Sequence, residues 1–220
     1  MYFPTLCLDN FFNDPREIHK KIEKIPLERT DNIPGYRSPS LHEIDRDLFQ
    51  YINTKMLAAL YPMHMNNLKF HADTKVQMSG PNPYDGWVHR DDEDGNILTG
   101  IVYLSDSTAG TSIYLKKDST IHDDIWDDRG KHEYFENYEN YTEEQLKEVE
   151  KGKQEINENF EESIIIKGKY NRLVLFDARA QHAAQIHTEN TNRLIIISFF
   201  RQIEITNMNI QHAIPVCRSI

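Results

Sequence analysis

The residues best suited to chemistry lie in one short string, GWVHRD, at positions 86–91. Side chains at positions i and i+2 of an extended strand point to the same side. His89 and Asp91 can therefore offer an imidazole and a carboxylate to one point in space. One more histidine from another strand would complete a face of two histidines and one carboxylate. That face leaves coordination positions open and is typical of non-haem Fe(II) sites.

The spacing His-x-Asp occurs twice more, so the flanking sequence has to separate the candidates. The triplet beginning at His122 lies in an acidic stretch without a strand pattern, and we interpret it as surface. The triplet of His71 and Asp73 lies in a plausible strand and is interpreted as containing a half-buried structural histidine. Only the string around His89 is followed by a polar turn and an apolar strand, ILTGIVYLSD.

The elements that must position these residues follow from residue 68 onward. Short segments rich in β-branched and aromatic residues alternate with turn formers, which is typical of strands. They are LKFHADTKVQM, GWVHR, ILTGIVYLS, GTSIYLKK, SIIIKG, NRLVLFDA, HAAQIH and NRLIIISFFRQI. Many short strands without interleaved helices favour an antiparallel sandwich or barrel.

The N-terminal third differs, because it contains helix signals. After a first strand, Asp14 can cap a helix, Pro15 suits its first position and Glu17 completes a capping box. A second helix is predicted over about 41–60, where apolar residues recur every three to four positions. The segment between these helices, RTDNIPGYRSPS, is rich in turn formers and is predicted to be a loop.

An acidic insertion at about 116–162 interrupts the strands. It contains tyrosines and then a helix with a capping box at Thr142–Gln145. Its apolar stripe is thin, which indicates a surface helix. The insertion is either a solvated decoration or a lid over the site, and the sequence leaves both open.

Composition excludes several classes of function. A net charge of −10 disfavours binding to a phosphate backbone, so nucleic acid is an unexpected partner. No run approaches the roughly 18 apolar residues of a membrane-spanning helix, and no secretion signal is evident. The two cysteines, Cys7 and Cys217, fit a reducing compartment. A cytoplasmic location is therefore expected.

The order of motifs resembles the prolyl 4-hydroxylase-like branch of the 2-oxoglutarate and Fe(II)-dependent dioxygenases. That order is His-x-Asp, a β-hairpin, a distal histidine in FDARAQH, and a basic residue at the head of RLIIISFF. The resemblance covers about residues 74–203. It implies His89, Asp91 and His182 as iron ligands. It further implies that Arg193 and Tyr103 bind the far carboxylate of 2-oxoglutarate.

Some assignments have alternatives. His187 is a second candidate for the distal ligand, although family spacing favours His182. Arg179 is either a residue on the substrate side or a surface arginine. Three aromatic residues could line a pocket or belong to the core: Tyr84, Trp87 and Tyr114.

The resemblance also implies a mainly β fold, a double-stranded β-helix (a cupin-like jelly roll) in a single domain, 1–220. The N-terminal helices, within about 1–67, would buttress a barrel core of about 68–204. The expected enzyme hydroxylates an unactivated C–H bond, of a prolyl residue or a free amino acid. It consumes O2 and 2-oxoglutarate, releases succinate and CO2, and has ascorbate as a further candidate cofactor.

The expected partner is a small-molecule or peptide substrate, and no oligomeric state is indicated. Two other readings stay open. One is a cupin-like small-molecule or metal-binding module without oxygenase activity. The other is an interaction protein that binds a partner through the acidic insertion.

Overall fold

Two antiparallel sheets form the body of the protein in a computed structural model that describes residues 2–29, 35–82, 86–92, 94–118 and 141–206. The larger sheet has the order β1-β8-β5-β10-β4-β3-β2 and the smaller one β7-β6-β9. This confirms the predicted mainly β class. The larger sheet consists of β1 (Leu6–Leu8), β2 (Glu28–Arg29), β3 (Tyr36–Arg37), β4 (Leu68–Ser79), β5 (Leu98–Tyr103), β8 (Arg172–Asp177) and β10 (Arg193–Ile205). The smaller sheet consists of β6 (Thr111–Lys116), β7 (Phe160–Ile166) and β9 (Gln181–Ala184).

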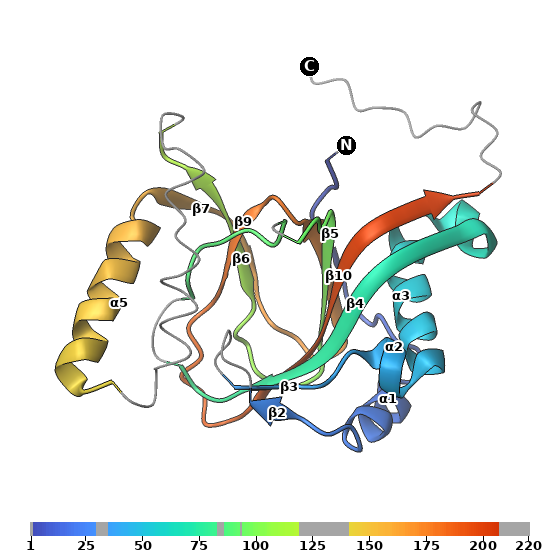
Figure 1. The fold of residues 1–220 in the computed structure, drawn as a ribbon, viewed down its shortest axis with the longest axis horizontal. Coiled ribbons are helices and arrows are strands. Elements are labelled where there is room, and N and C mark those ends of the chain that lie inside the picture. Colours follow the sequence, from blue (N-terminus) through green and yellow to red (C-terminus); the bar gives the residue numbers. More distant parts are fainter. Residues whose placement is uncertain (1, 30–34, 83–85, 93, 119–140, 207–220) are drawn as a thin grey trace.

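Helices cover one face of the larger sheet (Figure 1). They are α1 (Pro15–Ile22), α2 (Leu41–Ile44) and α3 (Arg46–Leu60), followed by the 3-10 helix η1 (Pro62–Asn67). Ile52 and Met56 of α3 pack in one core with Val76 and Ile196 of the sheet, and all four are fully buried. Burial of each such side chain stabilises the folded state by roughly 1.5–3 kcal/mol. This core therefore holds the helices against one face of the larger sheet.

The opposite face of the larger sheet meets the smaller sheet. A second core joins Ile101 and Ile195 of β5 and β10 to Ile113 and Ile166 of β6 and β7. Residues directly opposite each other on paired strands share a face. The register pairs Ile195 with Tyr103, so Tyr103 also points into the space between the sheets.

The helices differ from the prediction in two respects. The helix expected over 41–60 is divided at Asp45, whose backbone is not helical (φ −150°, ψ 84°). Its carboxylate accepts a hydrogen bond from Leu48 N at 2.9 Å and starts a new helix there. Asp14 caps α1 as predicted, but Glu17 binds Lys20 at 2.7 Å instead of completing a capping box.

The strands also differ in two places. The predicted loop at 29–40 contains β3, which pairs with β4 and extends the sheet, and part of β2. The string GWVHR forms only an isolated bridge, between His89 and His182, and no regular strand. The strand β3 was not predicted because its residues are rich in turn formers. It forms because β4 has an edge with which it can pair, and local sequence does not reveal that edge.

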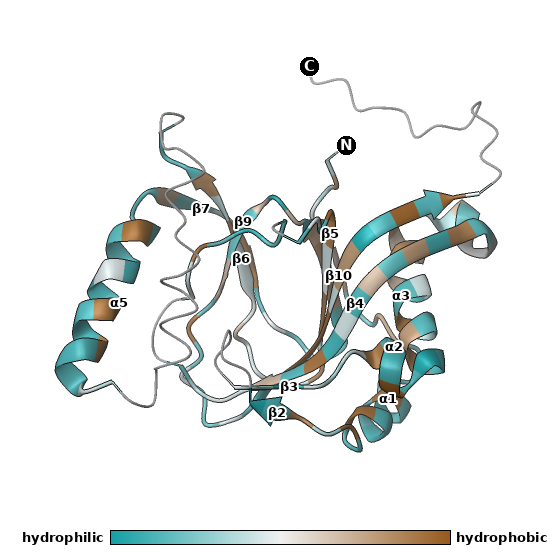
Figure 2. Ribbon diagram, in the orientation of Figure 1, coloured by the Kyte–Doolittle hydropathy of each residue, from teal (hydrophilic) through white to brown (hydrophobic). Residues whose placement is uncertain are grey.

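The helix α5 (Glu143–Asn157) lies between β6 and β7 in the chain. Thr142 caps it and Gln145 returns a bond to the Thr142 backbone, as the predicted capping box requires. Most of the helix is hydrophilic, with a thin row of apolar residues (Figure 2). The region of His122 lies outside the described residues, so the choice between lid and decoration stays a prediction. No helix in the described segments is long and apolar enough to cross a membrane.

A buried polar triad, Asn53, Thr74 and Ser198, links α3 to the sheet. The Thr74 hydroxyl lies 2.8 Å from Asn53 Nδ2 and 3.0 Å from Ser198 Oγ, and none of the three residues is exposed. We expect Thr74→Val to lower the free energy of unfolding by about 1–3 kcal/mol, because two buried polar groups lose a partner. Urea unfolding measures this. Thr54→Val, on α3, should change it by less than about 0.5 kcal/mol, and equal losses would contradict the prediction.

Candidate metal centre and cosubstrate pocket

Three side chains that the sequence singled out converge between the sheets: His89, Asp91 and His182. One ligand atom from each lies within 4.8 Å of the others. Asp91 Oδ1 is 3.5 Å from His89 Nε2, and Asp91 Oδ2 is 3.3 Å from His182 Nε2. The His182 side chain is 6% exposed and Asp91 11%, so the cluster is largely shielded from water.

Reciprocal backbone hydrogen bonds hold the two histidines side by side. His89 N donates to His182 O, and His182 N donates to His89 O, both at 2.8 Å. Gly86 permits this close approach, because a Cβ there would lie 2.6 Å from the carbonyl oxygen of Ala184. The imidazole rings consequently lie 4.3 Å apart, centroid to centroid.

A hydrogen bond at Nδ1 fixes the orientation of each imidazole ring. His89 Nδ1 lies 2.8 Å from the carbonyl oxygen of Trp87, and His182 Nδ1 lies 3.0 Å from that of Ala180. A carbonyl only accepts, so each Nδ1 must carry the proton. Each Nε2 then presents a lone pair toward Asp91 when the ring is neutral.

Hydrogen bonds from the larger sheet and from nearby loops hold Asp91 in position. The Thr99 hydroxyl of β5 donates to Asp91 Oδ2 at 2.8 Å, and Asp91 N donates to the carbonyl of Ala178 at 2.8 Å. Asn96 Nδ2 donates to the Asp91 carbonyl at 2.7 Å. Thr99 thus orients the carboxylate in the way that outer hydrogen bonds orient metal ligands.

The donor set fits a divalent cation. Two imidazole lone pairs and a carboxylate repel one another in a shielded site unless a cation or protons intervene. Two histidines and one carboxylate suit non-haem Fe(II) with coordination positions left open. Within the described part of the chain, this is the only group of three or more His, Cys, Asp or Glu residues close enough to hold a metal.

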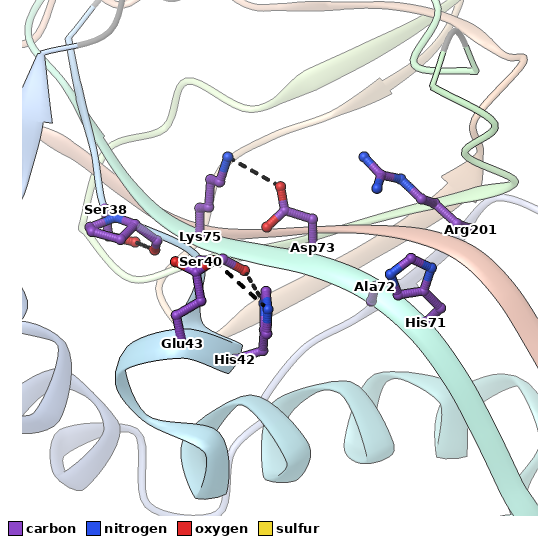
Figure 3. Close-up of a pocket in the computed structure, with 10 residues that line it drawn as sticks. Ser38, Ser40, His42, Glu43, His71, Ala72, Asp73, Lys75 and Arg201 are labelled. Atoms are coloured by element: carbon purple, nitrogen blue, oxygen red, sulfur yellow. Dashed lines mark hydrogen bonds and ion pairs between the residues drawn. The ribbon is translucent and has the colours of Figure 1, made fainter.

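The rival triplet at His71 lacks such convergence. His71 is exposed, whereas we predicted a half-buried residue. Asp73 forms an ion pair with Lys75 at 3.1 Å, and both line a pocket beside β4 with Arg201 and His42 (Figure 3). Burial opposes ionisation of Asp73, but hydrogen bonding and nearby cations outweigh it and lower its pKa. Its charge is therefore already balanced.

His187, the second candidate for the distal ligand, lies outside the cluster. It forms a backbone bridge with Asn82 and its side chain is 4% exposed. Neither ring nitrogen has a hydrogen-bond partner in the described segments, and Glu189 approaches Nε2 only to 4.0 Å. The geometry thus favours His182 over His187 beside Asp91.

Arg193 and Tyr103 lie on the same face of the larger sheet. The guanidinium carbon of Arg193 is 5.3 Å from the centre of the Tyr103 ring. The Tyr103 hydroxyl lies 2.7 Å from Thr111 Oγ1 on β6, and one of these two hydroxyls donates to the other. The hydroxyl that accepts in this pair keeps its own hydrogen free to donate to a ligand. Thr111, only 2% exposed, is a buried partner of Tyr103 that the sequence analysis did not name.

Arg193 is a buried cation held by neutral groups. It is 7% exposed, and its Nε donates to the carbonyl of Ala109 at 3.1 Å. Nη2 approaches the carbonyl of Gly110 to 3.5 Å. Across the described ranges, no carboxylate lies within ion-pair distance of this guanidinium. A buried charge without a counterion is costly, which makes this residue suited to bind an anionic ligand.

The other residues with two possible roles contact neighbouring protein groups where the structure describes them. Arg179 binds Asp177 through Nε at 2.7 Å and lies over the ring of Tyr2 at 4.0 Å. Tyr114 packs in a small core with Val88. Trp87 is 8% exposed, while Tyr84 and Cys217 lie outside the described residues.

Arg37 on β3 is a further residue beside the site that the sequence analysis missed. Its Nε and Nη2 both donate to Gln77 Oε1, at 3.2 and 2.7 Å. Burial lowers the pKa of Arg37, while the charges of Asp91 and Asp73 act in the opposite direction. The residue lay in a predicted loop, so no periodicity pointed to it.

Comparisons with known proteins agree with this architecture. A family model described as "Family of unknown function (DUF6445)" matches residues 3–194. No curated protein sequence matches the chain. HygX from Streptomyces hygroscopicus, solved with nickel and 2-oxoglutarate bound, superposes with a TM-score of 0.55 at 10% identity, over 89% of this chain and 82% of that chain.

Two further solved structures carry different activities. The alpha-ketoglutarate-dependent epimerase SnoN from nogalamycin biosynthesis has a TM-score of 0.53 at 11% identity, over 98% of this chain and 86% of its own. A prolyl hydroxylase from Trichoplax adhaerens, in complex with a hypoxia-inducible-factor peptide fragment, has a TM-score of 0.51 at 11% identity, over 89% and 82%. At such identities these likenesses establish the fold alone, and that fold supports more than one reaction.

The bond from Thr99 to Asp91 yields a test of the metal centre. We expect Thr99→Val to weaken Fe(II) binding about ten- to a hundredfold, because the carboxylate loses the donor that orients it. Anaerobic titration calorimetry measures the dissociation constant. The matched control is Thr111→Val, a buried hydroxyl that contacts Tyr103 and not Asp91. Equal Fe(II) affinities of the two variants would contradict the prediction.

Proposed function

The chain belongs to the DUF6445 family, and we propose that it is an Fe(II)- and 2-oxoglutarate-dependent oxygenase. The observation that carries this proposal is the convergence of His89, Asp91 and His182 between the sheets. Each imidazole is fixed with Nε2 toward the carboxylate. A cupin-like binding module without oxidative chemistry would not need this arrangement beside a buried arginine without a counterion.

We assign three ligands and a cosubstrate anchor. His89, Asp91 and His182 would hold Fe(II), and Arg193 with Tyr103 would hold the far carboxylate of 2-oxoglutarate. When bound together with O2, iron and 2-oxoglutarate supply an oxidation of C–H bonds, with release of succinate and CO2. Arg193 suits its role because its planar fork can form two parallel hydrogen bonds with a carboxylate.

The surrounding residues would prepare the site for that chemistry. Ile101, Ile195 and Ile197 line the face that also bears Tyr103, and each is at most 8% exposed. An apolar wall keeps water away and strengthens the electrostatic contacts inside. Thr111 orients the Tyr103 hydroxyl, so the cosubstrate carboxylate would meet fixed donors.

The finer proposals follow the sequence resemblance. The fold would be a double-stranded β-helix in one domain. The reaction would be a hydroxylation, as in the prolyl 4-hydroxylase-like branch, with ascorbate as an accessory reductant and a cytoplasmic location. Fold similarity to an epimerase and a prolyl hydroxylase supports the cofactor class more than the outcome of the reaction.

The first test is an anaerobic titration of the metal-free protein with Fe(II) and 2-oxoglutarate. We expect the visible charge-transfer band of the chelate in the wild type and its loss in His182→Ala. His187→Ala is the matched control, since this buried histidine lies outside the cluster. It should keep the band. Absence of the band in the wild type would sink the oxygenase proposal and favour a binding module.

A second test concerns the cosubstrate anchor. We expect Arg193→Gln to raise the dissociation constant for 2-oxoglutarate at least about 30-fold, since it removes one partner of a buried charge pair. Fe(II) affinity should change little, because Arg193 is not a proposed ligand. The band titration gives the first constant and calorimetry the second. Loss of both affinities together would indicate misfolding, and unchanged 2-oxoglutarate binding would refute the assignment.

A further inference from the structure

Arg37 lies in the same row of side chains as the proposed cosubstrate site. The register pairs Arg37 of β3 with Gln77 of β4, Gln77 with Ile195 of β10, and Ile195 with Tyr103 of β5. Opposite residues on paired strands share a face. The Arg37 side chain therefore extends along the face of the larger sheet that looks toward the smaller sheet.

Only some of the hydrogen-bond donors of the Arg37 guanidinium have a partner among the described residues. Gln77 Oε1 accepts from both Nε and Nη2, and Gln77 itself is 8% exposed. A guanidinium has five N–H groups, so both hydrogens of Nη1 and one of Nη2 stay available. They form the edge that binds carboxylates with two parallel bonds. Gln77 thus fixes the fork and leaves its binding edge unoccupied by the described residues.

The charge of Arg37 also lacks a direct counterion. Throughout the described residues, no carboxylate lies within ion-pair distance of it. Asp91 and Asp73 act on it from farther away, and burial still lowers its pKa. Asp73 is paired with Lys75, and Asp91 would be neutralised by a bound metal. Arg37 would then be a partly buried cation with only an amide as its partner.

A count of formal charges gives the same result. With neutral histidines, Asp91, Fe(II), Arg193 and Arg37 together leave a site with three positive charges. The 2-oxoglutarate dianion neutralises two of them. One positive charge is left over, on the arginine that 2-oxoglutarate does not occupy. The net charge of −10 on the chain makes a general attraction of anions an unsuitable explanation.

We propose that Arg37, oriented by Gln77, binds a carboxylate of the substrate, so that the substrate is a small molecule with a free carboxylate. This inference rests on the proposed function and narrows it. A free amino acid or another small organic acid fits the site, whereas an internal prolyl residue of a peptide has no carboxylate to offer. Arg37 is a specificity-determining residue and takes no part in holding the metal.

The test measures binding of simple acids and does not need the substrate. The protein is loaded anaerobically with Fe(II) and stoichiometric 2-oxoglutarate, so that no free dicarboxylate competes for Arg37, and the visible band verifies loading. Fluoroacetate and 4-fluorobenzoate are then titrated at constant ionic strength and observed by fluorine NMR, because high-spin iron broadens the signal of a ligand bound nearby. Fluoroacetamide and 4-fluorobenzamide are the neutral controls. We expect saturable broadening for the acids and none for the amides.

Two variants remove the anion site in opposite ways. Arg37→Gln deletes the cation, and Gln77→Glu supplies an internal carboxylate of the same shape for Arg37 to bind. Both should weaken acid binding at least about tenfold while the visible band persists. Arg29→Gln, an exposed arginine on the adjoining strand β2, is the matched control and should bind the acids like the wild type.

The outcomes separate the two proposals. A visible band without saturable acid binding would overturn the carboxylate inference and leave the oxygenase proposal intact. Equal acid binding by the wild type, Arg37→Gln and Gln77→Glu would also overturn it. Absence of the band in the wild type would overturn the oxygenase proposal and this inference with it. If Arg37→Gln fails to fold, Gln77→Glu still decides the matter, because it keeps the guanidinium in place.

Discussion

The two backbone hydrogen bonds between His89 and His182 are the interaction on which the site depends. The segment around His89 is not part of a regular sheet, so these bonds, with that from Gly86 N to the carbonyl of Ala184, fix its distance from β9. They bring two imidazoles together that are far apart in the chain. Gly86 and the carbonyls of Trp87 and Ala180 then determine how closely the segments approach and which nitrogen faces Asp91.

The larger sheet gives that bridge a rigid surface to lie beside. Its helical face is fixed by an apolar core and by the Asn53–Thr74–Ser198 triad. The other face can therefore carry charged groups without loss of order. Thr99 reaches Asp91 from this face, and Arg193 and Arg37 present their guanidiniums there. Packing on one side thus supports electrostatics on the other.

Much of the site could be predicted because its signals are local. His89 and Asp91 share a short string, which residue type and spacing were sufficient to nominate, and the resemblance of the motif order to a known family added His182 and Arg193. Whether they bind iron and 2-oxoglutarate stays a prediction. The mainly β class followed from strand patterns for the same reason.

What could not be predicted depends on tertiary neighbours. Asp45 ends one helix and starts another because its side chain finds Leu48 N, which periodicity does not reveal. Arg37 becomes part of a sheet only because the edge of β4 is available to it. The proposed metal ligands lie between the two sheets, whereas Arg37 lies on a strand of two residues near the edge of the larger sheet. If the proposed function holds, a change there would alter which substrate binds while the bridge, Thr99 and Arg193 keep their places.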